Sequence, residues 1–201
     1  AVRRDDPRIA DRRIDGDQGH ALRRGRGATG DQPGGGRKFV VIGDEHGLPI
    51  FDSAEKKAGK QRESARVSLA GKLRIFVRAY DQADGNAKHR RLGLYRIGYQ
   101  VLSVAGAPLP NFDQTRRNIE FDRLPSDWSQ SALVYAPGSR SGYEGPTVFN
   151  YIATNTLRKG VVKEDFFDTS KLASGDYTLR IVAADFFGNV AERDVPITIG
   201  Q

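Results

Sequence analysis

The chain has 201 residues, of which 38% are hydrophobic, and its formal net charge is +7. Cysteine is absent, which excludes a disulfide framework and thiol chemistry. No apolar run approaches the ~20 residues that a membrane-spanning helix needs, and no secretory signal peptide is visible.

Residues 1–37 differ in composition from the rest of the chain. They contain nine arginines, six aspartates and eight glycines, but no aromatic residue. Because so few apolar side chains cannot support a core, we predict a flexible or disordered Arg/Gly-rich segment before one domain at residues 38–201. Arg/Gly-rich tails can bind nucleic acid, but the interspersed aspartates and the lack of stacking aromatics disfavour that alternative.

From residue 38 onward, short apolar alternations are separated by glycine, proline, aspartate and asparagine. A period of two indicates strands with one buried face, and no stretch keeps a helical period for longer than a turn or two. We expect ten strands, at residues 39–42, 49–51, 67–69, 73–80, 92–102, 118–121, 133–135, 148–153, 177–184 and 195–199. This pattern predicts an all-β fold, an Ig-like antiparallel β-sandwich.

The longest of these strands, at residues 92–102, has a glycine among large side chains. Gly93 shares a face with Tyr95, Ile97 and Tyr99. A glycine in a strand interior predicts a bend or the close approach of another backbone.

The last two strands flank the sequence DFFGN, which predicts a tight hairpin turn. Gly188 and Asn189 tolerate the positive φ that such turns require. Asp185 can accept hydrogen bonds from the N–H groups of the turn. The alternative is a cation site formed by Asp185, Asn189 and Asp194, and we favour the structural turn because carboxylates beside turns are usually structural.

A similar strand-and-turn sequence occurs once more in the chain. Residues 73–87 resemble residues 179–191, and in both an apolar strand leads to an aspartate and then to Gly-Asn. We therefore expect Asp81, Gly85 and Asn86 to form a second structural turn. The repeat is too short to demonstrate duplication.

No group of residues predicts a catalytic centre, a cofactor or a metal site. Asp44, Glu45 and His46 are adjacent, but consecutive residues of a strand point to opposite faces, so a solvated turn is the favoured interpretation. Ser139 and Ser141 have no base nearby in the sequence and no nucleophile-elbow motif. Glu164 and Asp165 precede a buried-looking FFD, where they more readily begin a turn.

Two features suggest a binding surface or its support. The glycine-rich stretch at residues 136–146 carries Arg140 and Tyr143 on a loop that we expect to be exposed. Tyr143 could stack on a sugar or a peptide, although packing against its own loop is the commoner role of such a tyrosine. Trp128 is the only tryptophan, and we expect it to close the end of the sandwich.

A series of short motifs occurs in order between about residues 65 and 200. They are AxD followed by DG, a GLYR-type strand that ends at a G-x-P turn, FDR, and a closing strand pair around GN. The residues are Ala79, Asp81, Asp84, Gly85, Gly93, Leu94, Tyr95, Arg96, Gly106, Pro108, Phe121, Asp122 and Arg123. In this combination the chain resembles the region that follows the catalytic domain in bacterial lysostaphin-type zinc metallopeptidases.

The resemblance implies a non-catalytic accessory module in the cell envelope of a bacterium, extracellular or periplasmic. Its expected partners are a catalytic peptidase domain of the parent protein and peptidoglycan. That family holds zinc with an HxH motif and an aspartate, and because this chain has no HxH motif, no catalytic residue carries over. We expect no enzyme activity from the chain by itself, while a zinc metalloendopeptidase stays open for the parent protein. A stand-alone Ig-like structural or adhesion module is the alternative.

Overall fold

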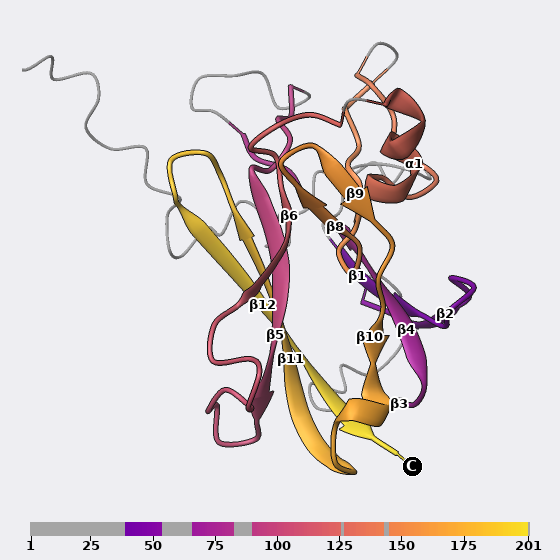
Figure 1. The fold of residues 1–201 in the computed structure, drawn as a ribbon, viewed down its shortest axis with the longest axis vertical. Helices are drawn as coiled ribbons and strands as arrows, with labels where there is room; N and C mark the ends of the chain where they lie inside the picture. Colours follow the sequence, from indigo (N-terminus) through magenta and orange to yellow (C-terminus); the bar gives the residue numbers. More distant parts are fainter. Residues whose placement is uncertain (1–38, 54–65, 83–89, 126, 143–144, 201) are drawn as a thin grey trace, which may run out of the picture.

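A computed structural model describes residues 39–53, 66–82, 90–125, 127–142 and 145–200. The predicted N-terminal segment, residues 1–37, lies outside these ranges. The described residues form strands arranged in two sheets, as the all-β prediction states (Figure 1). No helix in these ranges is long and apolar enough to cross a membrane.

The smaller sheet has five strands, with β4 at its centre. β1 and β2 form a hairpin on one side of β4, while β10 and β7 pair with successive parts of its other edge. All of these pairs are antiparallel. The bounds are β1 Phe39–Gly43, β2 Pro49–Asp52, β4 Lys72–Arg78, β7 Asn150–Ile152 and β10 Phe167–Asp168.

The larger sheet has seven strands in the order β3-β12-β11-β5-β6-β8-β9. The bounds are β3 Val67–Leu69, β5 Arg96–Ser103, β6 Arg116–Glu120, β8 Thr156–Arg158, β9 Val161–Lys163, β11 Gly175–Ala184 and β12 Val190–Ile199. Two pairs, β3 with β12 and β6 with β8, are parallel, so the prediction of a purely antiparallel arrangement is wrong there. Parallel partners need a crossover, and the chain supplies it by visiting the smaller sheet between β3 and β12 and between β6 and β8.

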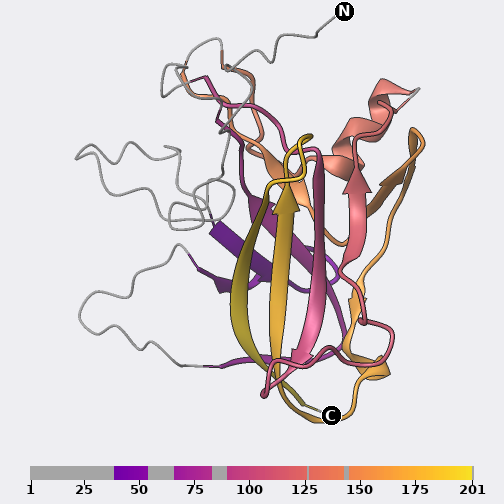
Figure 2. The ribbon, with the colours of Figure 1, turned by 90° about the vertical axis from the view of Figure 1, so that its left-hand side faces the viewer.

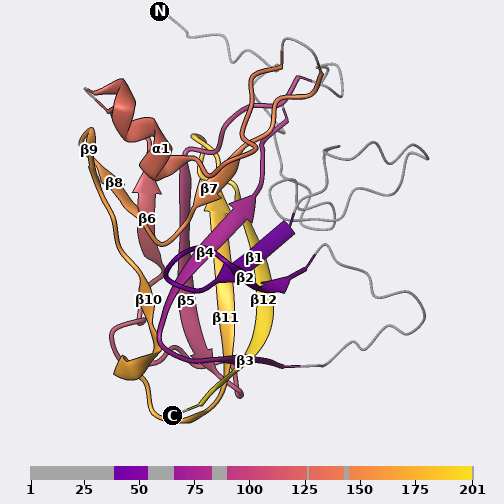
Figure 3. The same cartoon turned by 90° about the vertical axis from the view of Figure 1, so that its right-hand side faces the viewer.

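The two sheets share one hydrophobic core. The alternating side chains Leu73, Ile75 and Val77 of β4 are fully buried, as are Leu179 and Ile181 of β11. They belong to the same hydrophobic cluster. The period-two pattern therefore arises because each strand buries one of its faces against the opposite sheet. In Figures 2 and 3, β1 and β4 run obliquely across β5, β11 and β12.

The strand predicted at residues 133–135 is wrong. The short helices η1, at Trp128–Gln130, and α1, at Ser131–Val134, occupy this region. The Asp127 carboxylate accepts a hydrogen bond from the Ser129 N–H, 2.8 Å away, and so caps η1. Val134 alone points into the core from α1, and three apolar residues in a row do not distinguish a strand from one helical turn. A second short helix, η2, spans Thr169–Lys171.

The close backbone approach occurs at Gly98, not at Gly93. β5 begins at Arg96, and its pairing with β6 shifts register between Ile97 and Tyr99. A Cβ atom on Gly98 would lie 1.6 Å from the carbonyl oxygen of Arg116, whereas one on Gly93 would be 3.4 Å from the Tyr151 hydroxyl. The bulge therefore requires glycine at position 98.

Candidate functional site

The turn between β11 and β12 is held by a carboxylate. Asp185 Oδ1 accepts a hydrogen bond from the Asn189 N–H at 2.9 Å, and Asp185 Oδ2 accepts one from Asn189 Nδ2 at 2.7 Å. Gly188 has a φ of 88°, in the left-handed region that favours glycine. Asp185 is also buried. Its two oxygens are thus engaged within the turn itself.

Asp194, the third residue of the alternative cation site, is engaged elsewhere. It lies on β12 opposite Arg180 of β11, which donates from Nε and Nη2 to the two carboxylate oxygens at 2.8 and 2.9 Å. This bidentate pair, with its charge-assisted hydrogen bonds, raises the pKa of Arg180. The structure therefore does not bring Asp194 together with Asp185 and Asn189.

The second predicted turn follows a different course. Asp81 forms a two-way backbone bridge with Leu92, and its carboxylate accepts from the Gln82 N–H at 2.7 Å. It therefore closes a longer connection than Asp185 does. Gly85 and Asn86 lie outside the described residues.

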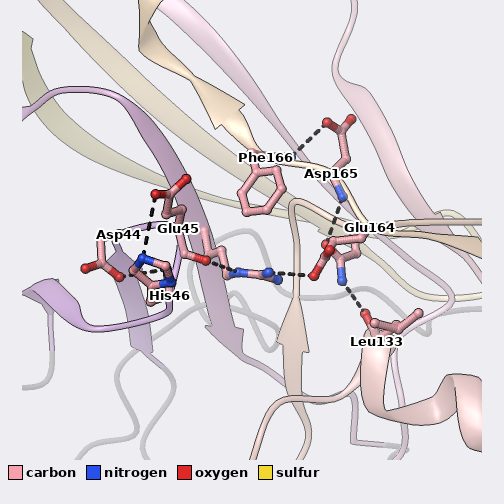
Figure 4. Close-up of polar contacts among 9 residues, drawn as sticks. Asp44, Glu45, His46, Leu133, Glu164, Asp165 and Phe166 are labelled. Carbon is pink, nitrogen blue, oxygen red and sulfur yellow. Dashed lines mark hydrogen bonds and ion pairs between the residues drawn. The ribbon is translucent and has the colours of Figure 1, made fainter.

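The Asp44–His46 group forms a turn that is tied to the rest of the smaller sheet. Asp44 Oδ1 accepts from the N–H groups of His46 and Leu48 at 2.9 and 2.8 Å. Arg74 of β4 donates to the Glu45 carbonyl at 2.9 Å and pairs with the Glu164 carboxylate. Figure 4 shows residues 44–46 on one side of this contact and residues 164–166 on the other.

This cluster does not offer a zinc ligand set. Arg74 also lies over the Phe166 ring, 4.7 Å from its centroid, so a cation already occupies the space between the acidic groups. The side chains of Glu45 and His46 are exposed. In the part of the chain that the structure describes, no three His, Cys, Asp or Glu residues are arranged to hold a metal ion. The zinc that the resemblance implies for a catalytic domain therefore has no fit here.

Arg140 lies at the base of its loop, where the chain pairs with itself. Its N–H and carbonyl exchange hydrogen bonds with Val148, both at 3.0 Å. The Asn150 amide extends this pairing, because it donates to the Pro137 carbonyl at 3.0 Å and accepts from Arg78 Nε at 2.7 Å. The Arg140 side chain is exposed. Tyr143 lies outside the described residues.

Large apolar side chains gather at one end of the larger sheet. Phe186 and Phe187 at the tip of the β11–β12 turn are 73% and 69% exposed. The strand register places that tip next to the start of β5, and the end of β6 and the β8–β9 connection follow in turn at the same end of the sheet (Figure 1). We call this end of the sheet the apolar end, and the exposed apolar residues of the segments that reach it are Leu124, Val161, Phe186, Phe187 and Val190.

Side chains at the start of β5 pack against the tip of the β11–β12 turn. The Tyr95 ring meets the Phe186 ring edge-to-face at 5.2 Å, and the Arg96 guanidinium lies 5.0 Å from the centre of the Tyr95 ring. Arg96 pairs in turn with Glu120, which also binds Arg158. A fixed arrangement of exposed aromatic side chains is a feature of binding surfaces, because little conformational entropy is lost when a partner docks.

The expectation that Trp128 closes the end of the sandwich is wrong. Trp128 is 85% exposed at the start of η1. Tyr135 and Tyr151 fill the interior nearby, where they pack with Phe121 and Phe149. Burial raises the pKa of Tyr135 to about 12 and raises the pKa of Tyr151 as well.

The apolar end was not predicted from the sequence, although a signal was present. Phe186 and Phe187 are consecutive and lie between two alternating strands, so neither strand face can bury them. By contrast, nothing near Trp128 in the sequence indicates exposure. Comparisons with family models, with curated proteins and with solved structures find no match to this chain.

Proposed function

We propose that this chain is a non-catalytic, Ig-like β-sandwich accessory module of a bacterial cell-envelope protein related to peptidoglycan metallopeptidases. In this role it packs beside a zinc peptidase domain and positions that domain on peptidoglycan. The module works outside the cytoplasm, where peptidoglycan is found.

The observation that carries this proposal is the apolar end. Exposed apolar side chains on a monomer are usually scattered, and a concentration of them marks an interaction surface. Here Leu124 and Val161 are exposed after β6 and at the start of β9, and the aromatic side chains Phe186 and Phe187 are exposed at the tip of the β11–β12 turn. A neighbouring domain that covers this end would remove their rings from water, which favours docking.

The motifs behind the resemblance support a structural role for this region. Asp185 and Asn189 bond to each other within their turn, and the Asp122 carboxylate accepts from the Lys159 N–H at 3.0 Å. Tyr95 and Arg96 brace the aromatic tip. These residues maintain the loops that present the surface, as expected of an accessory module.

Two experiments test the proposal. The reading frame directly upstream should encode a domain with an HxH motif, and that domain should bind the purified chain in a calorimetric titration. Replacing Phe186 and Phe187 together by serine should weaken the association about tenfold or more, since buried aromatic anchors dominate such interfaces. The matched control replaces Leu48 and Ile50 by serine and should leave binding unchanged. Both residues are exposed; Leu48 directly precedes β2 and Ile50 lies on it.

The same preparation tests whether the chain is catalytic. It should release no soluble fragments from purified peptidoglycan, with or without added zinc, because catalytic zinc normally needs three protein ligands. Stoichiometric zinc whose removal abolishes hydrolysis would contradict the proposal. If the upstream reading frame encodes no domain with an HxH motif, the proposed function is wrong and the stand-alone adhesion module replaces it.

A further inference from the structure

Three arginines from separate segments form hydrogen bonds with residues 147–150. Arg91, which precedes β5, donates from Nη1 to the Thr147 carbonyl at 3.4 Å. Arg140 pairs through its backbone with Val148, and Arg78 at the end of β4 donates to the Asn150 side chain. We call Arg78, Arg91 and Arg140 the arginine cluster.

The charges of the arginine cluster repel one another. The pKa of Arg78 lies below its usual value, first because burial disfavours its charge and then because Arg91 and Arg140 lie near it. The Asp52 carboxylate acts in the opposite direction but does not outweigh these causes. Placing like charges together in a partly desolvated site is unfavourable, and a bound anion would relieve it.

Arg91 is held in place with part of its donor capacity unused. Its guanidinium lies over the Tyr80 ring, 4.4 Å from the centroid, which fixes the plane of the group. Its Nε atom is buried and has no hydrogen-bond partner in the structure. A buried donor without an acceptor costs free energy, so the site favours a ligand that supplies oxygen atoms. Arg140 is exposed and adds a further positive charge near Arg78.

We propose that the arginine cluster binds a phosphoryl group. A carboxylate has two oxygens and one charge, which a single guanidinium fork already satisfies. Several guanidinium groups approaching from different segments instead suit a tetrahedral oxyanion that carries up to two charges and accepts hydrogen bonds from several directions. Arg91 and Arg140 contact the ligand, while Arg78 adds positive charge and holds Asn150 beneath the loop. The site is independent of the peptidase partner proposed above.

Titration of inorganic phosphate into the purified full chain, followed by calorimetry at low salt, tests this site. We expect saturable binding to one site, weakening as salt is added because the attraction is electrostatic. Arg91→Gln and Arg140→Gln should each raise the Kd about tenfold or more, and Arg140→Lys should lie between, since lysine keeps the charge but lacks the fork. Acetate should bind more weakly than phosphate.

The control is Arg123→Gln, which removes one exposed charge outside the cluster. An equal loss of affinity in this variant, or no saturable binding by the unchanged chain, would overturn the proposal. Arg140 is exposed, so Arg140→Gln should fold normally, and its melting curve without phosphate verifies this.

A second arm identifies the source of the phosphoryl group, using glycerol phosphate and a polymer of glycerol phosphate in the same titration. Tighter binding of the monomer assigns the site to a terminal phosphate, and tighter binding of the polymer assigns it to a phosphodiester chain. Failure of the peptidase-docking experiment would not affect either result.

Discussion

Asp185 accepts two hydrogen bonds from Asn189 inside the turn, so its removal leaves those donors without their acceptor. We expect Asp185→Ala to lower the free energy of unfolding by about 1–2 kcal/mol, the usual cost of a lost capping contact. Urea unfolding of the variant and the unchanged chain measures this difference. Asn189→Ala, which keeps the Asp185 carboxylate, should cost less because the backbone N–H of residue 189 still donates.

Calcium provides the control for the Asp185 prediction. If Asp185 held a cation, millimolar calcium would raise the melting midpoint of the unchanged chain by mass action, and Asp185→Ala would abolish the rise. Because both Asp185 oxygens already accept hydrogen bonds from Asn189, we expect identical midpoints with calcium and with chelator.

Tyr135 should make the stability of the protein fall at alkaline pH. Burial raises its pKa in the folded state to about 12 from the usual 10.0. The contribution of Tyr135 to the free energy of unfolding is therefore complete below the pKa of the unfolded state, and it is lost as the pH rises through the pKa of the folded state. Tyr135→Phe should flatten the decline in unfolding free energy between about pH 10 and 12, measured by urea titration. Some decline should remain, because burial also raises the pKa values of Tyr99 and Tyr151.

At the scale of elements, the β5–β6 bulge depends on Gly98. An added Cβ would overlap the Arg116 carbonyl oxygen, which is backbone and cannot rotate away. We expect Gly98→Ala to destabilise the protein by about 3 kcal/mol or more, at the upper end of overpacking costs. Gly93→Ala is the control, and thermal melts of the two variants should differ clearly. Equal melting midpoints would contradict this account of the bulge.

Long strands with one buried face could be predicted from the sequence, whereas of the short strands β1, β2 and β3 were predicted and three others were not. The alternation of residues 73–80 and 177–184 was correct because each of these strands buries alternate side chains in the shared core. β8, β9 and β10 were missed because two or three residues are too few to show a period. α1 was mistaken for a strand for the same reason.

At the scale of the whole molecule, residues 1–37 are predicted to be dispensable for folding. They supply almost no apolar side chains, so their deletion should leave the cooperative melt nearly unchanged. Calorimetry of the chain with and without them measures this. A fall in the midpoint of about 5 °C or more would mean that they contribute structure to the domain.

The candidate sites show what the sequence could not reveal at this scale. The glycine-rich loop around Arg140 indicates a binding surface in the sequence, but its neighbours Arg78 and Arg91 come from other segments, and only the fold brings them together. The same holds for the apolar end, where the strand order β11-β5-β6-β8 brings the tip of the β11–β12 turn to the same end of the sheet as the β8–β9 connection. The order of strands in a sheet cannot be predicted from a single sequence.

The parallel pairing of β3 with β12 has a consequence for how the chain folds as it is synthesised. Arg66 donates to the carbonyl of Ile197, 131 positions further along, and the adjoining strands pair over three residues. Closing so long a loop is entropically costly, and contacts of high sequence separation slow folding. During synthesis, β3 therefore has no partner strand until β12 has been made. Until then, the backbone N–H and C=O groups of β3 are open to pairing with other chains. Hydrogen exchange pulsed during refolding should show the β11–β12 hairpin protected early and residues 67–69 protected last.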